Sequence, residues 1–86
     1  MITAKSGADA AREIELWARM VARANDSAIE ASVYDDPDSS TYVIRLAVGN
    51  RVLLFRLSEA QVQSPEREGE CEKILKRKMQ DLRRNR

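Results

Sequence analysis

Two stretches of alternating apolar and polar residues meet at Gly49-Asn50, and this pattern restricts the possible folds more than any other feature of the chain. TYVIRLAV before the link and RVLLFRL after it place large apolar side chains at every second position, which is typical of strands with one buried face. A two-residue link that begins with glycine favours a tight hairpin. Such a hairpin pairs Val48 with Arg51 and therefore brings Ile44 opposite Phe55 on the buried face.

The stretch before this hairpin, AIEASVY, alternates in the same way and predicts a further strand. We expect Ile29 to face Leu46 on the buried side, which sets Glu30 opposite Arg45 on the other side as a favourable pair of charges. A shift of two residues would keep the same side chains on the same face. The sequence therefore leaves this second register open.

A helical period precedes the strands. Apolar residues recur three or four positions apart from Ala10 onward, while charged residues occupy the other side. Ser6 is the expected N-cap, and Asn25-Asp26-Ser27 is expected to end the helix. Trp17 is the largest side chain of the apolar line, so we expect it to be a central contact of the core.

The segment after the strands predicts a short helical turn and then a long helix. Ser58-Glu59-Ala60-Gln61 has the spacing of a capping box, and Ser64-Pro65-Glu66 is typical of a helix start. The last helix should run from about Pro65 to near Leu82. It carries an apolar stripe made of Cys71, Leu75, Met79 and Leu82.

Together these segments predict an α+β fold with the order α-β-β-β-α, a three-stranded antiparallel meander with two helices packed on one face. The chain of 86 residues has the length of one small domain, and we expect residues 1–86 to form it, with 1–6 and 84–86 frayed. A core of this size leaves a small stability margin, which favours an oligomer.

The residue types exclude most kinds of catalytic chemistry. The chain has no histidine, one cysteine and three glycines, so histidine-based catalysis, a cysteine–histidine zinc site and a glycine-rich phosphate loop are excluded. Cys71 is flanked by Glu70 and Glu72, which disfavour a reactive thiolate, and is expected to pack against other helices or strands. The acidic loop of residues 35–40 lacks the ligand pattern of a calcium loop and is typical of a turn. We therefore expect no enzyme, no catalytic residues, no cofactor and no metal site.

Two further features indicate the compartment. A single cysteine cannot form an intrachain disulfide and fits a reducing compartment. The N-terminal residues lack the apolar segment of a secretory signal, and no apolar run approaches the ~20 residues that span a bilayer. We expect a cytoplasmic protein that contacts no membrane and takes no small-molecule substrate.

The face of the sheet away from the helices is more apolar than a solvated face should be. In addition, the third strand lacks the lysine, proline or bulge signals that protect an edge from pairing. Both features favour a partner surface made of Val43, Arg45, Val52, Leu54 and Arg56. We therefore expect a small non-enzymatic protein-protein interaction or inhibitor-type protein that forms a homodimer. The dimer contact is either the third strand or the apolar stripe of the C-terminal helix.

The end of the chain carries a cluster of positive charge. Seven of the fourteen residues from 73 to 86 are Lys or Arg, and four glutamates precede them, an order that the helix dipole favours without any ligand. The cations exceed what the dipole requires, so binding of nucleic acid is an alternative function. The net charge of +1 gives no general attraction to a polyanion. The candidate contacts are Lys73, Lys76, Arg77, Lys78, Arg83 and Arg84.

Overall fold

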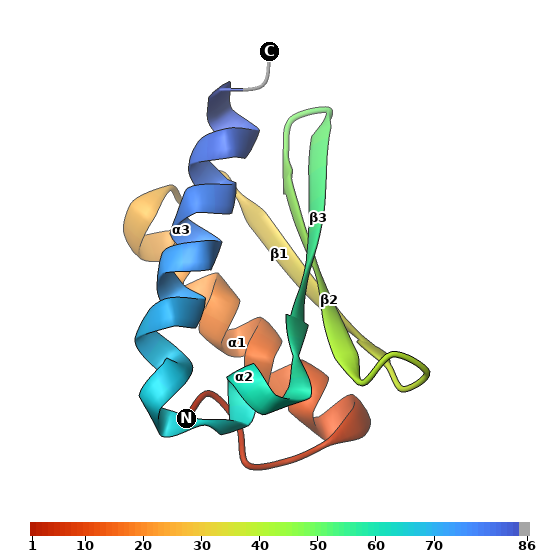
Figure 1. Ribbon diagram of the computed structural model, residues 1–86. Coiled ribbons are helices and arrows are strands. Elements are labelled where there is room, and N and C mark those ends of the chain that lie inside the picture. The colour runs from red at the N-terminus through yellow and green to blue at the C-terminus, as the bar shows by residue number, and fades with distance from the viewer. Residues whose placement is uncertain (85–86) are drawn as a thin grey trace.

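A computed structural model describes residues 1–84 and shows one three-stranded sheet with all of its helices on the same side (Figure 1). This arrangement confirms the predicted fold class. The elements in chain order are α1 Gly7–Asn25, β1 Glu30–Asp36, β2 Thr41–Val48, β3 Arg51–Ser58, α2 Glu59–Gln63, a 3-10 turn Pro65–Arg67 and α3 Glu68–Arg84.

The strands pair in the order β1-β2-β3, and both pairs are antiparallel. The predicted register of β2 and β3 is confirmed, because Val48 pairs with Arg51 and Ile44 with Phe55. The predicted register of β1 and β2 is wrong by two residues. Ser32, and not Glu30, lies opposite Arg45.

The turn between β1 and β2 explains this shift. The Ser39 amide donates to the Asp36 carbonyl at 3.3 Å, which places Pro37 second in a turn that begins with an aspartate. Proline and aspartate both favour these positions. The turn therefore closes with Asp36 opposite Thr41, and the whole strand follows that register. The same side chains remain on the buried face, as the shift by two requires.

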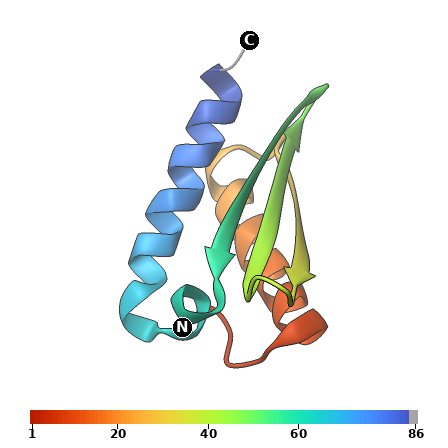
Figure 2. The same cartoon turned by 45° about the vertical axis from the view of Figure 1, so that its right-hand side comes forward.

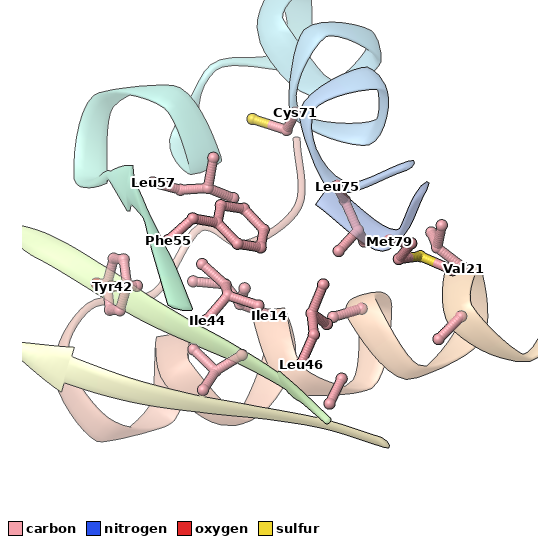
Figure 3. Close-up of a cluster of buried hydrophobic side chains, with 14 of the residues drawn as sticks. Ile14, Val21, Tyr42, Ile44, Leu46, Phe55, Leu57, Cys71, Leu75 and Met79 are labelled. Carbon is pink, nitrogen blue, oxygen red and sulfur yellow. The ribbon is translucent and has the colours of Figure 1, made fainter. Parts of the chain in front are cut away.

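The two long helices cover one face of the sheet side by side (Figures 1 and 2). α1 packs along β1, whereas α3 contacts both β2 and β3. Ile14 of α1, Ile44 of β2 and Leu75 of α3 are completely buried where these layers meet (Figure 3). The apolar stripe of the last helix therefore lies inside its own domain, since none of its members is more than 3% exposed.

The position of Trp17 differs from the prediction. Its ring is only partly buried and packs against the rim of the core, while Ala10, Ile14 and Ala18 form the buried line of α1. Small alanine side chains let the helix lie close to β1, and a bulky indole does not fit between two such close elements. The prediction of Trp17 as a central core contact is therefore wrong.

The first residues of the chain lie against α2, and the expectation that residues 1–6 fray stays a prediction. The Ile2 and Thr3 amides donate to the Val62 carbonyl at 3.0 and 3.2 Å, and Thr3 is only 2% exposed. The N-terminal ammonium of Met1 pairs with Glu68 at 2.9 Å. The expectation for the other end falls partly on residues 85–86, which lie outside the described residues.

The entry to the last helix takes two steps. Ser58 caps α2 with both hydrogen bonds of a capping box, which confirms that prediction. The chain then makes the 3-10 turn at Pro65, and α3 begins at Glu68, three residues later than the sequence predicts. Glycine has a low helix propensity, and Gly69 in the first turn of α3 is consistent with this looser start.

Candidate protein-interaction surface

The outer face of the sheet, which the helices leave uncovered, gathers all five residues predicted to contact a partner. Three apolar residues on this face are exposed: Tyr34 by 52%, Val52 by 51% and Leu54 by 60%. The strand registers arrange the face in three cross-strand rows, which are Tyr34–Val43–Arg56, Ser32–Arg45–Leu54 and Glu30–Ala47–Val52.

The edge of the sheet at β1 is closed by side chains of α1. The Val33 amide donates to Glu15 Oε1 at 3.0 Å, and Arg19 Nε donates to the Ala31 carbonyl at 3.1 Å. Glu15 and Arg19 also form an ion pair at 3.2 Å, one helical turn apart. These side chains occupy two of the outward backbone groups of β1 that an added strand would need. A partner strand therefore cannot pair with β1 unless it displaces them.

The opposite edge, at β3, is open. In antiparallel strands, the amide and carbonyl of successive residues point to opposite sides of the strand. The groups of Ala31 and Val33 point away from β2. Following this alternation through both registers, the groups of Val52, Leu54 and Arg56 point outward from β3. Within residues 1–84, none of these outward amides and carbonyls has a hydrogen-bond partner. The Ser58 amide, at the end of the strand, is used by Gln61 in the capping box.

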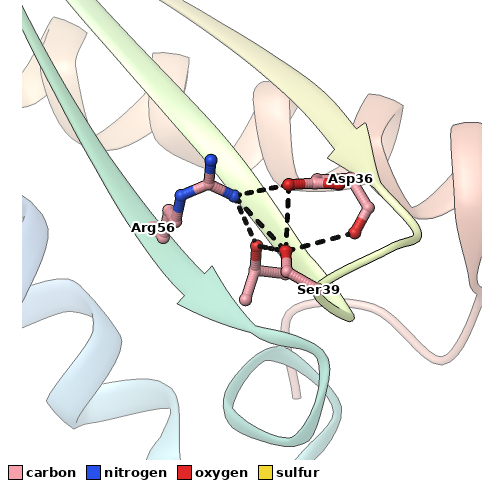
Figure 4. A network of polar contacts seen from close by, with 4 residues as sticks. Asp36, Ser39 and Arg56 are labelled. Carbon is pink, nitrogen blue, oxygen red and sulfur yellow. Dashed lines mark hydrogen bonds and ion pairs between the residues drawn. The ribbon is translucent and has the colours of Figure 1, made fainter.

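Arg56 is held by its own chain. Its Nη1 lies 2.7 Å from Asp36 Oδ2 and 2.9 Å from Thr41 Oγ1, and the Ser39 hydroxyl completes the cluster (Figure 4). The hydrogen bonds from Arg56 and Ser39 hold the pKa of the Asp36 carboxyl below its usual value. The Arg56 guanidinium is therefore tied to the loop between β1 and β2, and it is less available to a partner than the sequence alone implies.

Arg45 differs from Arg56 in this respect. It sits in the middle row of the outer face, between Ser32 and Leu54, and is partly buried there. Its guanidinium has no hydrogen bond or ion pair within the described part of the chain. A cation without a partner, next to the exposed Leu54, is suited to bind a carboxylate of another molecule.

The six basic residues predicted to contact nucleic acid do not share one surface. Lys76 pairs with Glu72 at 3.0 Å and Arg83 pairs with Asp26 at 3.4 Å, so these two cations lie on the side of α3 near α1. Helical spacing places three others on the exposed side of α3 opposite the buried stripe, and Lys78 on the side near β3. The three exposed residues are Lys73, Arg77 and Arg84. Contact with nucleic acid stays a prediction.

A second apolar patch on α1 was missed by the sequence reasoning. Leu16 is 56% exposed and Met20 is 71% exposed, one helical turn apart and next to the partly buried Trp17. Their spacing of four residues, outside the line that Ala10 and Ile14 start, was the signal that the sequence contained. Met20 and Trp17 line a shallow groove between α1 and α3.

Cys71 is fully buried, and burial together with Glu70 and Glu68 raises the pKa of its thiol. No group of three or more acidic or cysteine side chains in residues 1–84 is arranged to hold a metal ion. Over the same residues, no helix has the length and apolar character to cross a membrane.

Comparison with known proteins gives no significant match to a protein-family model, a curated protein or a solved structure.

Proposed function

We propose that this chain is a non-enzymatic protein-interaction protein of the inhibitor type, which works as a homodimer paired through β3. The observation that carries the proposal is the difference between the two edges of the sheet. Glu15 and Arg19 occupy the β1 edge, whereas the outward groups of β3 have no partner within residues 1–84. Natural proteins usually protect an exposed edge, so an open one that carries an exposed Leu54 favours a strand as its partner.

The outward groups of β3 define how two copies would pair. Val52, Leu54 and Arg56 are spaced evenly about Leu54. An antiparallel pair with its two-fold axis at Leu54 joins Leu54 to its own copy and Val52 to Arg56 of the second copy, so that all three residues find partners. The pairing stops at Ser58, because its amide is already bonded to Gln61. The product is a continuous six-stranded sheet.

The helices leave room for this joint. α3 contacts both β2 and β3, so it is set back from the edge of the sheet. With strands ~4.8 Å apart, two such helices would lie about two strand spacings, or roughly 10 Å, from each other beneath the joint. Packed helices are typically about 8–10 Å apart. The competing contact through the apolar stripe of α3 is disfavoured, because Leu75 and Leu82 are buried inside the domain.

Pairing through β3 would also enlarge the outer face. The two Leu54 side chains would meet at the centre of a six-stranded surface, with the Arg45 of each copy beside its own Leu54 in the same cross-strand row. Arg45 has no partner within residues 1–84, so a target protein with a carboxylate among apolar side chains would suit this face.

Replacing Leu54 with Glu tests the proposal, because it places two carboxylates at the two-fold axis and leaves the buried side of β3 unchanged. Light scattering coupled to size exclusion should show a dimer for the wild type and a folded monomer for Leu54→Glu. The matched control is Tyr34→Glu, which adds the same charge to the same face on the far strand and should remain dimeric. A wild-type protein that is monomeric at high micromolar concentration would overturn the proposal.

A further inference from the structure

One side of the last helix carries charged residues at intervals that are symmetric about Ile74. Counted from Arg67, in the 3-10 turn before α3, the residues on this side follow at intervals of three, four, four and three positions. Such spacing keeps them on one side of a helix. We define the edge flank as Arg67, Glu70, Ile74, Lys78 and Asp81.

The edge flank faces away from α1. Glu72, Lys76 and Arg83 mark the side of α3 next to α1, where they line the grooves between the two helices. The edge flank lies half a turn of the helix away from these residues. Ile74 within it is partly buried against the core, and Lys78 is also partly buried. This side of α3 is therefore turned toward β3 and the open edge.

The charges of the edge flank are complementary to those of a second copy that runs in the opposite direction. In chain order they read positive, negative, apolar, positive and negative. If a second copy runs antiparallel with Ile74 at the two-fold axis, Glu70 lies opposite Lys78 of that copy, and Arg67 lies opposite Asp81. Every charged residue of the flank thus meets its opposite, and Ile74 meets Ile74.

The ion pairs that α3 forms within the chain lie on its other side, near α1. On the side near α1, Glu68 pairs with the N-terminus of Met1, Glu72 pairs with Lys76, and Arg83 pairs with Asp26. On the edge flank, none of the four charged side chains forms an ion pair within residues 1–84. Glu70 has only a hydrogen bond from the Gln61 side chain, at 3.3 Å. The four charges of the edge flank are therefore available for ion pairs with a second copy.

The same axis can serve both the strand and the helix. Arg51, at the start of β3, donates to the Leu82 carbonyl near the end of α3, and Cys71 near its start lies against the Gln61 carbonyl just after β3. β3 and α3 therefore run alongside each other in opposite directions. The middle of β3, at Leu54, thus lies beside the middle of α3, within one helical turn of Ile74.

We propose that the edge flanks of two copies pair antiparallel beneath the β3 joint and fix the symmetry of the homodimer. The inference rests on the proposed function, since it assigns a second contact to the same dimer. The contact between the edge flanks adds discrimination between partners. Backbone hydrogen bonds at the strand edge can form with any strand, whereas this order of charges selects a second copy of the chain in one orientation.

A charge exchange tests the pairing. Glu70→Lys makes residues 70 and 78 both positive, and Lys78→Glu makes both negative, so each variant repels its own copy at two symmetric contacts. Each variant alone should raise the dimer dissociation constant on the order of tenfold, since about 1.4 kcal/mol corresponds to that change. An equal mixture of the two should form a heterodimer with an affinity near that of the wild type, because both contacts are again opposite in charge. Sedimentation with one variant fluorescently labelled measures this directly.

Lys73→Glu is the matched control, since it reverses an exposed lysine on the same helix outside the edge flank. It should leave the dissociation constant within about twofold of the wild type, well inside one tenfold step of 1.4 kcal/mol. Single variants that weaken the dimer without recovery in the mixture would overturn the pairing, and so would an equal effect of Lys73→Glu. If Leu54→Glu yields monomers while the flank variants dimerise as tightly as the wild type, the β3 dimer stands and only the flank contact is refuted. A monomeric wild type would refute both.

Discussion

Replacing Trp17 with Ala should destabilise the protein less than replacing the smaller Ile14 with Ala. Ile14 is 0% exposed and lies between α1 and the sheet, so its loss should cost about 2–5 kcal/mol as a cavity in the core. Trp17 is only partly buried, at the rim of the core. Its removal forfeits only the covered part of the indole, which we place at about 1–2 kcal/mol at ~25 cal/mol per Å² of apolar area. Burial, and not side-chain size, sets this order.

Urea unfolding followed by far-UV circular dichroism measures both variants in the same way. Fluorescence is unsuitable because Trp17 is the sole tryptophan. All samples need the same protein concentration, since dimer formation adds to the apparent stability. Leu16→Ala is the control on the exposed side of α1 and should change stability by less than about 0.5 kcal/mol. If Trp17→Ala costs as much as Ile14→Ala or more, the indole belongs to the core centre and the packing described for α1 is wrong.

Two further predictions concern polar contacts of the sheet. Glu15→Ala removes the acceptor of the Val33 amide, so it should lower the free energy of unfolding by about 1–3 kcal/mol. Hydrogen exchange should become faster at that amide than at any other in β1. Unchanged exchange at the Val33 amide would show that the contact does not close the edge. The lowered pKa of Asp36 implies stability that is present above the unfolded pKa and is lost as pH falls through the folded pKa. Arg56→Leu should raise the Asp36 pKa toward its usual value in an NMR titration of the carboxyl carbons, and an unshifted titration would contradict the role given to Arg56.

Local features of the fold could be predicted because their causes lie close together in the chain. The register of β2 and β3 depends on a two-residue link, and the buried faces depend on alternation that any register shift by two preserves. The capping box at Ser58 likewise involves residues only three positions apart. The positions of Val52 and Leu54 could be predicted for the same reason, since alternation alone puts both on the side away from the helices.

Contacts between distant segments decided the rest. Trp17 belongs to the apolar line of its helix, but its depth depends on how closely the alanines bring α1 to β1. The β1 edge is closed because the Val33 amide, eighteen residues from Glu15, lies beside α1 once the sheet has formed. The charges of the edge flank can be read from the sequence, yet whether they face α1 or the open edge depends on how α3 is rotated against the sheet. Periodicity determined which face of each helix and strand is turned toward the core. Only tertiary packing decided how deeply each side chain is buried and which exposed groups remain without a partner, because both depend on neighbours that the chain order does not specify.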